Sequence, residues 1–246
     1  MNKNVQLIRK IEQVSSLSNQ TKEQMFQLMN LYYTNTFRSQ FETDLSEKNR
    51  VLLIINSQSN ELAGFSTQKI FKTTFNQSTY TILFSGDTIM QHHYWGAGGM
   101  ELVLAFGELM MQIIDGDPDT PAYWMLISKG LRTYKYLPVF FNEYYPTYTK
   151  QTPSEIKLLM NFLGDLKFGD KYNPKTGIIE ASEQAQFLKP EYQPEKSIRK
   201  PHEKLYYELN PGYEKGDELL CLSPLTMNNL NTFIKEKLLN IKNAVN

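Results

Sequence analysis

The stretch from Thr79 to Ile114 constrains the fold most, because it reads as a strand, a tight glycine turn and a helix. Its first residues alternate between β-branched and aromatic side chains, as in a strand with one buried face. The small residues Gly-Ala-Gly-Gly follow at positions 96–99. Apolar residues then recur at helical spacing at positions 102, 103, 106, 109, 110 and 113. The sequence therefore predicts a strand–turn–helix unit.

A glycine turn that opens a helix is a potential anion site. Free backbone N–H groups and the helix dipole both favour negative charge there. A turn that only packs the helix on the sheet is an equal alternative. The dinucleotide fingerprint is excluded, because Glu101 stands where its third glycine would follow Gly96 and Gly98. The Walker A phosphate loop is excluded, because no lysine lies between Lys72 and Lys129.

The segment from His93 to Gly98, with sequence His-Tyr-Trp-Gly-Ala-Gly, resembles the Arg/Gln-x-x-Gly-x-Gly/Ala motif of the GCN5-related acyl-CoA N-acyltransferase superfamily. His93 stands where that family has Arg or Gln, so acyl carrier protein is an alternative to acyl-CoA as the donor. The resemblance implies that His93 and the backbone of the following turn bind the CoA pyrophosphate. It also implies that the preceding strand end pairs with the pantetheine arm. The implied binding residues are Thr88, Ile89, Met90, His93, Trp95, Gly96, Ala97, Gly98 and Gly99.

The order of predicted elements fits the same superfamily. Strands are expected at 51–56, 62–75 and 79–84, and another at 121–128 follows the helix. A helix between two strands is a crossover connection, so the flanking strands should be parallel and adjacent. We therefore expect an α+β fold with a mixed, mostly antiparallel central sheet, a splayed parallel strand pair and flanking helices. Residues 1–246 are expected to form one domain with a long irregular insertion at about 147–203.

The remaining elements are predicted from periodicity and caps. Helices are expected over 3–14, from Thr21 to about 33, over 152–164 and from Thr226 onward, with a polar link at 38–49. Residues 202–209 and 218–222 are expected to be two strands of a closing hairpin. The excursion at 165–201 is rich in Gly, Pro and charge, and is typical of a lid, a substrate wall or a mobile segment.

Two tyrosines and two basic residues follow the strand at 121–128. By the resemblance, a tyrosine on the short helix here protonates the leaving CoA thiolate. Tyr134 is the first candidate and Tyr136 the second. Packing in an aromatic patch is the alternative for both. Lys129 and Arg132 are candidates for binding the CoA phosphates.

Acylation of an amine needs a base, because only the neutral amine attacks. Asp87 lies at the end of the central strand and is the candidate base or acceptor-binding carboxylate. Its pKa would have to be raised by burial, or a water would have to relay the proton. His92 is a further candidate, because a histidine titrates near neutral pH. Glu143 and His202 are lesser candidates.

Composition excludes several classes of protein. Twenty-six basic and twenty-six acidic residues cancel, which argues against nucleic acid as the main partner. The single cysteine, Cys221, allows no disulfide and no cysteine-based zinc site within the chain. It is expected to be a buried core residue of a cytoplasmic protein. Adjacent His92 and His93 lack a spaced third ligand, so no metal is expected. No run of about 18 apolar residues predicts stable membrane insertion.

The leading hypothesis is therefore an N-acyltransferase that uses acyl-CoA or acyl carrier protein and acylates a small-molecule or peptide amine. The high aromatic content and the long segment after Tyr148 favour an acyl chain or acceptor larger than in a minimal acetyltransferase. A non-catalytic module of the same fold, binding acyl-CoA or a protein partner, is the second hypothesis. A different α/β or α+β enzyme with a purely structural glycine turn is the third.

Overall fold

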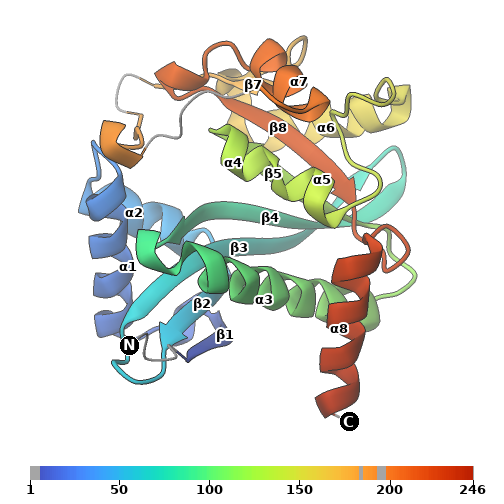
Figure 1. Cartoon of the computed structure of the whole chain (residues 1–246). Coiled ribbons are helices and arrows are strands. Elements are labelled where there is room, and N and C mark those ends of the chain that lie inside the picture. Colours follow the sequence, from blue (N-terminus) through green and yellow to red (C-terminus); the bar gives the residue numbers. More distant parts are fainter. Residues whose placement is uncertain (1–5, 183–184, 193–197, 246) are drawn as a thin grey trace.

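The computed structural model describes residues 6–182, 185–192 and 198–245, which are arranged around one mixed sheet (Figure 1). The strand order is β1-β2-β3-β4-β5-β8-β7-β6. β4 and β5 are parallel, and every other neighbouring pair in the described sheet is antiparallel. The strands are β1 (Leu7–Gln13), β2 (Arg50–Asn56), β3 (Leu62–Phe75), β4 (Ser78–Met90), β5 (Ala122–Ser128), β6 (Tyr172–Asn173), β7 (Ile178–Ile179) and β8 (Glu218–Pro224). The predicted fold class, with its central parallel pair, is confirmed.

Helices cover both faces of the sheet, with α3 crossing one face (Figure 1). The helices are α1 (Asn19–Tyr32), α2 (Arg38–Ser46), α3 (Trp95–Gly116), α4 (Leu131–Tyr134), α5 (Tyr136–Phe140), α6 (Ser154–Phe168), α7 (Pro201–Leu209) and α8 (Thr232–Val245). On the α3 face, one apolar core joins α3, α4, α5 and α8 to the strands. On the other face, α1 and α2 pack over β2 and β3, while α6 packs over β4, β5 and β8. The two helical groups of that face leave the C-terminal half of β4 between them.

α3 is the central crossover helix that the sequence predicts. With the short turn before it, it is long and apolar enough to cross a membrane by length and composition. In this structure it packs against β1, β2, β3 and α8. Gly107 permits the contact with α8, since a Cβ there would lie 2.4 Å from Leu238 Cδ2. Cys221 is fully buried in the same core, as predicted.

The first element differs from its prediction: residues 7–13 form β1, not a helix. β1 pairs with β2 and has its inner side against α3. The alternation is hard to recognise because a charged residue stands on the inner side. The Arg9 guanidinium bonds Glu101 and Glu108 of α3, with N···O distances of 2.7 Å each. β1 supplies the first strand that the sequence does not reveal.

The predicted closing hairpin is also wrong, because residues 201–209 form helix α7. Pro201 opens the helix, and Glu203 completes a capping box with the backbone N–H of Lys200. The buried residues of α7 are Glu203 and Tyr206, and their spacing of three residues is that of a helix and not of a strand. β8 does form where predicted, but its neighbours are β5 and β7.

Smaller differences have local causes. Residues 38–46 of the expected polar link form α2. The N-cap of α1 is Ser18, three residues before the predicted cap Thr21, and the Ser18 hydroxyl accepts a hydrogen bond from Thr21 N–H. α6 continues past Gly164, because this glycine makes room for the ring of Tyr172. The helix ends instead at Gly169, whose φ of +53° favours glycine. α8 begins at Thr232, after a turn bonded by Thr226.

The excursion after α6 is partly ordered into structure. It adds β6 and β7 to the sheet edge and then runs back to the end of α1. Thr34 N–H donates to Phe187 O, and Lys189 N–H donates to Tyr32 O, at N···O distances of 2.9 and 2.8 Å. The excursion therefore joins α1 to the opposite end of the sheet. Residues 183–184 and 193–197 of the expected insertion lie outside the described residues.

Candidate active site

The candidate site begins where β4 and β5 separate. The two strands pair only from Thr81–Ser85 against Ala122–Leu126, and β4 then continues to Met90 without β5 beside it. Figure 1 shows the two strands diverging toward the side of α1. This is the splayed parallel pair expected from the resemblance. Two cavities reach the gap, one from each face of the sheet.

A bulge in β4 starts the divergence. Ser85 lies opposite Gln68 of β3, and Thr88 lies opposite Ser66, so Gly86 and Asp87 together face a single residue. Such a bulge bends its strand and re-aims side chains. Here it turns β4 away from β5 and directs Asp87 toward the face opposite α3.

The wide cavity lies on that face and has a volume of about 660 Å³. α2 and the segment that joins α1 to it wall the cavity on one side, α6 and the excursion wall it on the other, and the strand ends form its floor. Its lining is polar and carries charges of both signs. The charged lining residues are Asp44, Glu47, Lys48, Asp87, Lys129, Lys167, Lys171, Glu180 and Glu218.

The narrow cavity lies on the α3 face and has a volume of about 40 Å³. Its walls are mainly apolar, with Leu102, Val103, Phe106, Trp124, Leu126 and Phe140 among them. Thr88 of β4 and Thr133 of α4 line both cavities. The cavities therefore approach each other across the sheet at the gap between β4 and β5.

Comparisons with solved structures give distant similarities. They include a conserved protein of unknown function from Enterococcus faecalis V583, a probable N-acyltransferase, at 14% identity and a TM-score of 0.39 over 52% of this chain and 31% of that chain. An acyl-CoA N-acyltransferase from Pseudomonas aeruginosa has 13% identity and a TM-score of 0.36 over 55% of this chain and 88% of its own. Arabidopsis thaliana NAA60 in complex with acetyl-CoA has 15% identity and a TM-score of 0.39 over 56% and 87%.

The similarity to the Enterococcus protein thus spans about a third of that chain. No protein-family model and no curated protein matches this sequence. At these TM-scores, the assignment depends on the topology of this chain itself. Its strand order, crossover helix and diverging parallel pair agree with the acyl-CoA N-acyltransferase-like fold that the resemblance implies.

The glycine stretch differs from its prediction. Positions 96–99 are not a turn before α3 but the first turn of α3 itself. A 3₁₀ turn at His92–Tyr94 leads into the helix, and Trp95 N–H donates to His92 O. That N–H is therefore not free for a pyrophosphate, contrary to expectation. A Cβ on Gly96 or Gly99 would meet nothing within 4 Å, so both leave room for a ligand.

Gly98 has a packing role instead. A Cβ there would lie 2.7 Å from Met90 Sδ and 3.2 Å from Tyr94 Cβ. The missing side chain lets the start of α3 approach the end of β4. Ala97 is exposed beside it. The phosphate-binding roles predicted for Gly96, Ala97 and Gly99 stay predictions, with open space around the two glycines in their favour.

The end of β4 has one edge bonded and one edge open to the gap. Gln91 N–H donates to Ala63 O, at 2.8 Å, on the β3 side. Because main-chain groups alternate along a strand, Ile89 also faces β3, while Thr88 and Met90 face the gap. Met90 O already accepts a bond from Trp95 Nε1 at 2.8 Å. A pantetheine arm could therefore pair with Thr88, and would compete with the indole at Met90.

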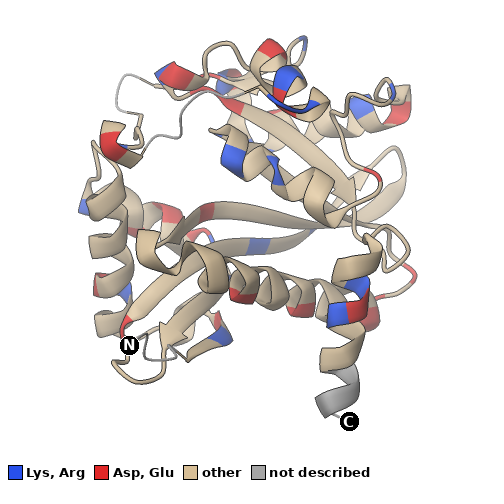
Figure 2. Cartoon of the chain, in the orientation of Figure 1, with Lys and Arg blue, Asp and Glu red and all other residues tan. Residues whose placement is uncertain are grey.

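Arg132 and Lys129, both predicted to bind phosphates, lie in different places. The Arg132 guanidinium stacks 3.9 Å from the centroid of the Trp95 ring, beside the start of α3. α4, which carries Arg132, lies on the side where β4 and β5 diverge, and basic positions are seen on this part of the ribbon in Figure 2. Lys129 lines the wide cavity and pairs with Glu218 at 3.2 Å. Arg132 is thus near the glycines, and Lys129 is not grouped with it.

Asp87 lies on the floor of the wide cavity and is half-buried. Burial raises the pKa of its carboxyl above the ordinary value of 3.8, while Lys48 and Lys129 act in the opposite direction. This is the direction that the sequence requires for a base at this position. Burial lowers the pKa of Lys48, which approaches Gly86: a Cβ there would lie 2.7 Å from Lys48 Cε.

Tyr134 lies in the core and Tyr136 lies at a cavity. Tyr134 is fully buried, and its hydroxyl donates to Pro146 O at 2.8 Å. Burial raises its pKa, and it lines neither of the two cavities. Tyr136 lines the narrow cavity, and burial raises its pKa as well. The geometry therefore favours the second candidate over the first, and both catalytic roles stay predictions.

The two adjacent histidines lie outside both cavities. His92 and His93 are exposed on the 3₁₀ turn, with their rings against Trp95 and Tyr94 at centroid distances of 4.3 and 4.0 Å. The lesser candidates Glu143 and His202 do not line the cavities either. In the described part of the chain, no cluster of three His, Cys, Asp or Glu side chains could hold a metal ion.

Several site residues are not found by sequence reasoning. Lys48 and Lys167 line the wide cavity, and the sequence analysis predicts no site role for either. Ser66, Gln68 and Ser85 are buried polar residues at the narrow cavity. A usable signal exists for this group, because polar residues two apart interrupt otherwise apolar strands. For the lysines, no local pattern distinguishes a cavity residue from a solvated one.

Proposed function

We propose that this protein transfers a short acyl group from acyl-CoA to an amine. The observation that carries the proposal is the meeting of two chemically different cavities at the gap between β4 and β5. A polar cavity containing a carboxylate suits an amine, and an apolar cavity suits an acyl chain. The two ligands would meet beside Thr88, where nucleophile and thioester need to be in contact.

The acceptor belongs in the wide cavity. The Asp87 carboxylate attracts an ammonium group and then accepts its proton, and its raised pKa makes it a better base near neutral pH. The nitrogen forms a bond to the carbonyl carbon, the carbon–sulfur bond breaks, and the thiolate takes a proton. Tyr136 or water supplies that proton. The lysines of the lining favour an acceptor that also carries an anionic group, such as an amino acid or a peptide.

The donor belongs on the α3 side. Gly96 and Gly99 leave space for phosphate oxygens at the first turn of α3, and Arg132 provides positive charge there. The acyl group would extend into the narrow cavity. A volume of about 40 Å³ holds only a few water-sized groups, which favours two to four carbons over a long chain. Acyl carrier protein remains the alternative carrier of the same thioester.

Calorimetric titration with acetyl-, butyryl- and palmitoyl-CoA, combined with thiol release in a panel of amino acids, peptides and diamines, tests the proposal. Binding of the short thioesters and amine-dependent thiol release are expected. No binding of any CoA thioester would contradict a CoA donor. Binding without release would favour a non-catalytic module of the same fold, an alternative supported by the burial of Tyr134.

A further inference from the structure

A chain of buried hydrogen bonds runs across three strands and ends in the gap. Trp124 Nε1 of β5 donates to Ser85 Oγ of β4 at 2.8 Å, and Ser85 bonds Gln68 Oε1 of β3 at 2.7 Å. Gln68 Nε2 bonds Ser66 Oγ at 2.7 Å, and Ser66 Oγ lies 2.6 Å from Thr88 Oγ1. All members except Thr88 are at most 4% exposed.

The hydrogen bonds of this chain can all run in one direction, from Trp124 toward Thr88. An indole N–H can only donate, so Ser85 Oγ accepts there and gives its own proton to Gln68. Gln68 therefore presents its oxygen to Ser85 and its NH₂ to Ser66. The Ser66 oxygen accepts from that NH₂. Either hydroxyl of the Ser66–Thr88 pair could donate, and Ser66 is the donor when the direction set by Trp124 continues through the chain.

Thr88 thus accepts a bond from within the protein, and its own proton is left to point outward. Its best internal acceptor in the described structure is Gly86 O at 3.5 Å, well beyond a good O–H···O distance of about 2.8 Å. The side chain lines both cavities. The hydroxyl is therefore a hydrogen-bond donor held at the point where the two cavities approach each other.

We propose that the Thr88 hydroxyl donates a hydrogen bond to the carbonyl oxygen of the bound thioester, and that Trp124, Ser85, Gln68 and Ser66 are positioning residues that fix its direction. This rests on the proposed function. As the amine attacks, negative charge develops on that oxygen, and a pre-oriented donor stabilises it. The donor costs no reorganisation, because the buried network already sets its orientation.

The test is the infrared carbonyl stretch of acetyl-CoA labelled with ¹³C at the thioester carbon, bound to the full-length protein. Binding to the wild type should lower the stretch frequency, and Thr88→Val should abolish most of that shift. Thr88→Ser keeps the hydroxyl and should retain the shift. Thr81→Val is the matched control on the same strand, because the buried Thr81 hydroxyl has no partner in the described structure. Equal shifts in wild type and Thr88→Val would overturn the proposal.

Binding affinities separate this proposal from the one it rests on. Thr88→Val should weaken acetyl-CoA about fivefold, the value of one net hydrogen bond, and leave S-ethyl-CoA unchanged because that thioether has no carbonyl. If the wild type binds both and the variant weakens neither selectively, the Thr88 proposal fails alone. If the wild type binds neither acetyl-CoA nor S-ethyl-CoA, the proposed function is wrong, and the Thr88 proposal that rests on it is wrong as well. Thr88→Ala serves if the valine variant does not fold.

The network is tested by a residue that does not reach the thioester. Ser85→Ala removes the hydroxyl between Trp124 and Gln68, so the Gln68 amide is free to turn over. Thr88 would then donate inward for part of the time, and the carbonyl shift should fall between those of the wild type and Thr88→Val. A merely structural role would not change this frequency. A full wild-type shift in Ser85→Ala would show that the network does not set the direction.

Discussion

The two cavities differ in almost every physical property, although they lie on opposite faces of the same two strands. One is wide, polar and lined by charges of both signs, and the other is narrow and mainly apolar. Both are consequences of one bulge, which separates β4 from β5 and sends Asp87 to one face and Thr88 to the gap. A single irregularity in a strand thus creates two different binding environments.

The difference between the cavities also assigns their ligands. Removing a charged amine from water costs free energy unless a carboxylate pairs with it. Of the two cavities, only the wide one has a carboxylate in its lining. A hydrocarbon chain gains most where water is already excluded, which the narrow cavity offers. If the assignment is right, changes on one face should affect the acceptor and changes on the other should affect the donor.

The largest effect is expected from Asp87→Asn, which removes the carboxylate of the wide cavity. Loss of a general base should lower the amine-dependent rate about 100- to 10,000-fold. The dissociation constant of acetyl-CoA should stay unchanged, because the proposed donor site is on the other face. Thiol-release kinetics and calorimetry measure the two quantities, with Asp165→Asn on the exposed side of α6 as the control. An equal loss of acetyl-CoA binding would break the division between the cavities.

The same variant should change stability in the opposite sense. Burial raises the folded-state pKa of Asp87, so the native protein holds that proton more tightly than the unfolded chain does. The free energy of unfolding of the wild type therefore falls as pH rises from the unfolded-state pKa of about 3.9 through the raised folded-state pKa. Asp87→Asn should unfold at a higher temperature than the wild type at pH 7, with the gain fading by pH 3. A constant difference over that range would contradict the raised pKa.

An intermediate effect is expected from Phe106→Ala, which enlarges the narrow cavity. The centroid of the Phe106 ring lies 4.7 Å from that of Trp124, and the ring lines the narrow cavity, so in the proposed assignment it limits the length of the acyl chain. The turnover ratio of hexanoyl-CoA to acetyl-CoA should rise about 10- to 100-fold, since each methylene in an apolar pocket changes discrimination by roughly 1–3 kcal/mol. Phe162→Ala, on the α6 face beside Phe75, is the matched control. Unaltered chain-length preference would place the acyl group elsewhere.

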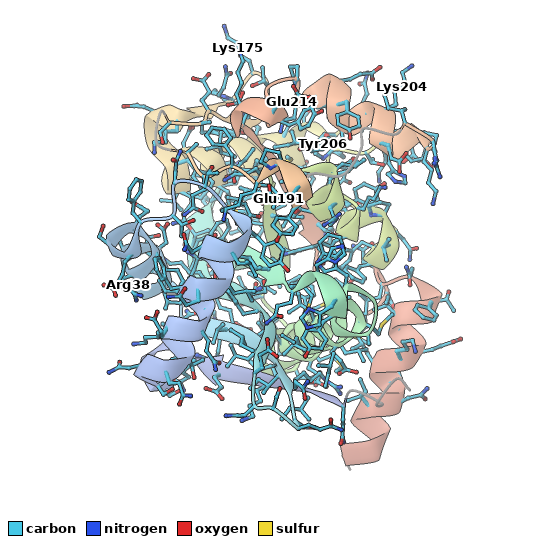
Figure 3. The ribbon with its side chains drawn as sticks, turned by 60° about the vertical axis from the view of Figure 1, so that its left-hand side comes forward. Arg38, Lys175, Glu191, Lys204, Tyr206 and Glu214 are labelled. Atoms are coloured by element: carbon cyan, nitrogen blue, oxygen red, sulfur yellow. The ribbon has the colours of Figure 1, made fainter. Side chains whose placement is uncertain are left out.

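A smaller effect is expected from Arg132→Gln. Loss of the guanidinium beside the first turn of α3 should weaken acetyl-CoA about tenfold at low salt, and less at high salt because charge interactions are screened. Arg38→Gln is a close control, since Arg38 stacks 4.1 Å from the Phe26 ring at the surface (Figure 3). Titrations at two salt concentrations measure both. A salt-independent loss would instead indicate collapse of the Trp95 stack.

The smallest effect on activity is expected from Glu203→Gln, which lies outside both cavities. Lys135 Nζ, 2.6 Å away, and two backbone N–H groups lower the pKa of Glu203 to about 2. The stabilisation is present above the unfolded pKa of about 4.3 and is lost as pH falls toward 2. The variant should lose about 2 kcal/mol at pH 7 and little at pH 2. Denaturant unfolding checks this, with exposed Glu208→Gln as the control.

Sequence patterns predict the centre of this molecule better than its ends. β2, β3, α3 and β5 are rich in buried apolar residues, so burial and local preference agree. The sequence does not predict strand β1, because Arg9 occupies an inward position. Only its two glutamate partners on α3 explain that position. The sequence does not predict helix α7 either. Tyr206, which is fully buried and is labelled in Figure 3, belongs to a core that the local sequence does not reveal.

The candidate site is predictable in the same uneven way. Asp87 is found from its position at a strand end, and its raised pKa follows from burial. Tyr134 is placed on the correct short helix, but packing turns its hydroxyl to Pro146. Lys48 and Lys167 reach the wide cavity from elements about 120 residues apart. Such a meeting is a property of the tertiary fold, and no spacing in the sequence encodes it.

The main-chain bonds between the end of α1 and residues 187–189 bear on how the protein folds. They connect segments about 150 residues apart, and they complete the wall of the wide cavity. Closing so long a loop costs conformational entropy. The contacts that offset this cost form only after the sheet between the segments has formed. The cavity should therefore be among the last features to appear during refolding. A growing chain on the ribosome would complete its core helix well before it acquires a place for the acceptor.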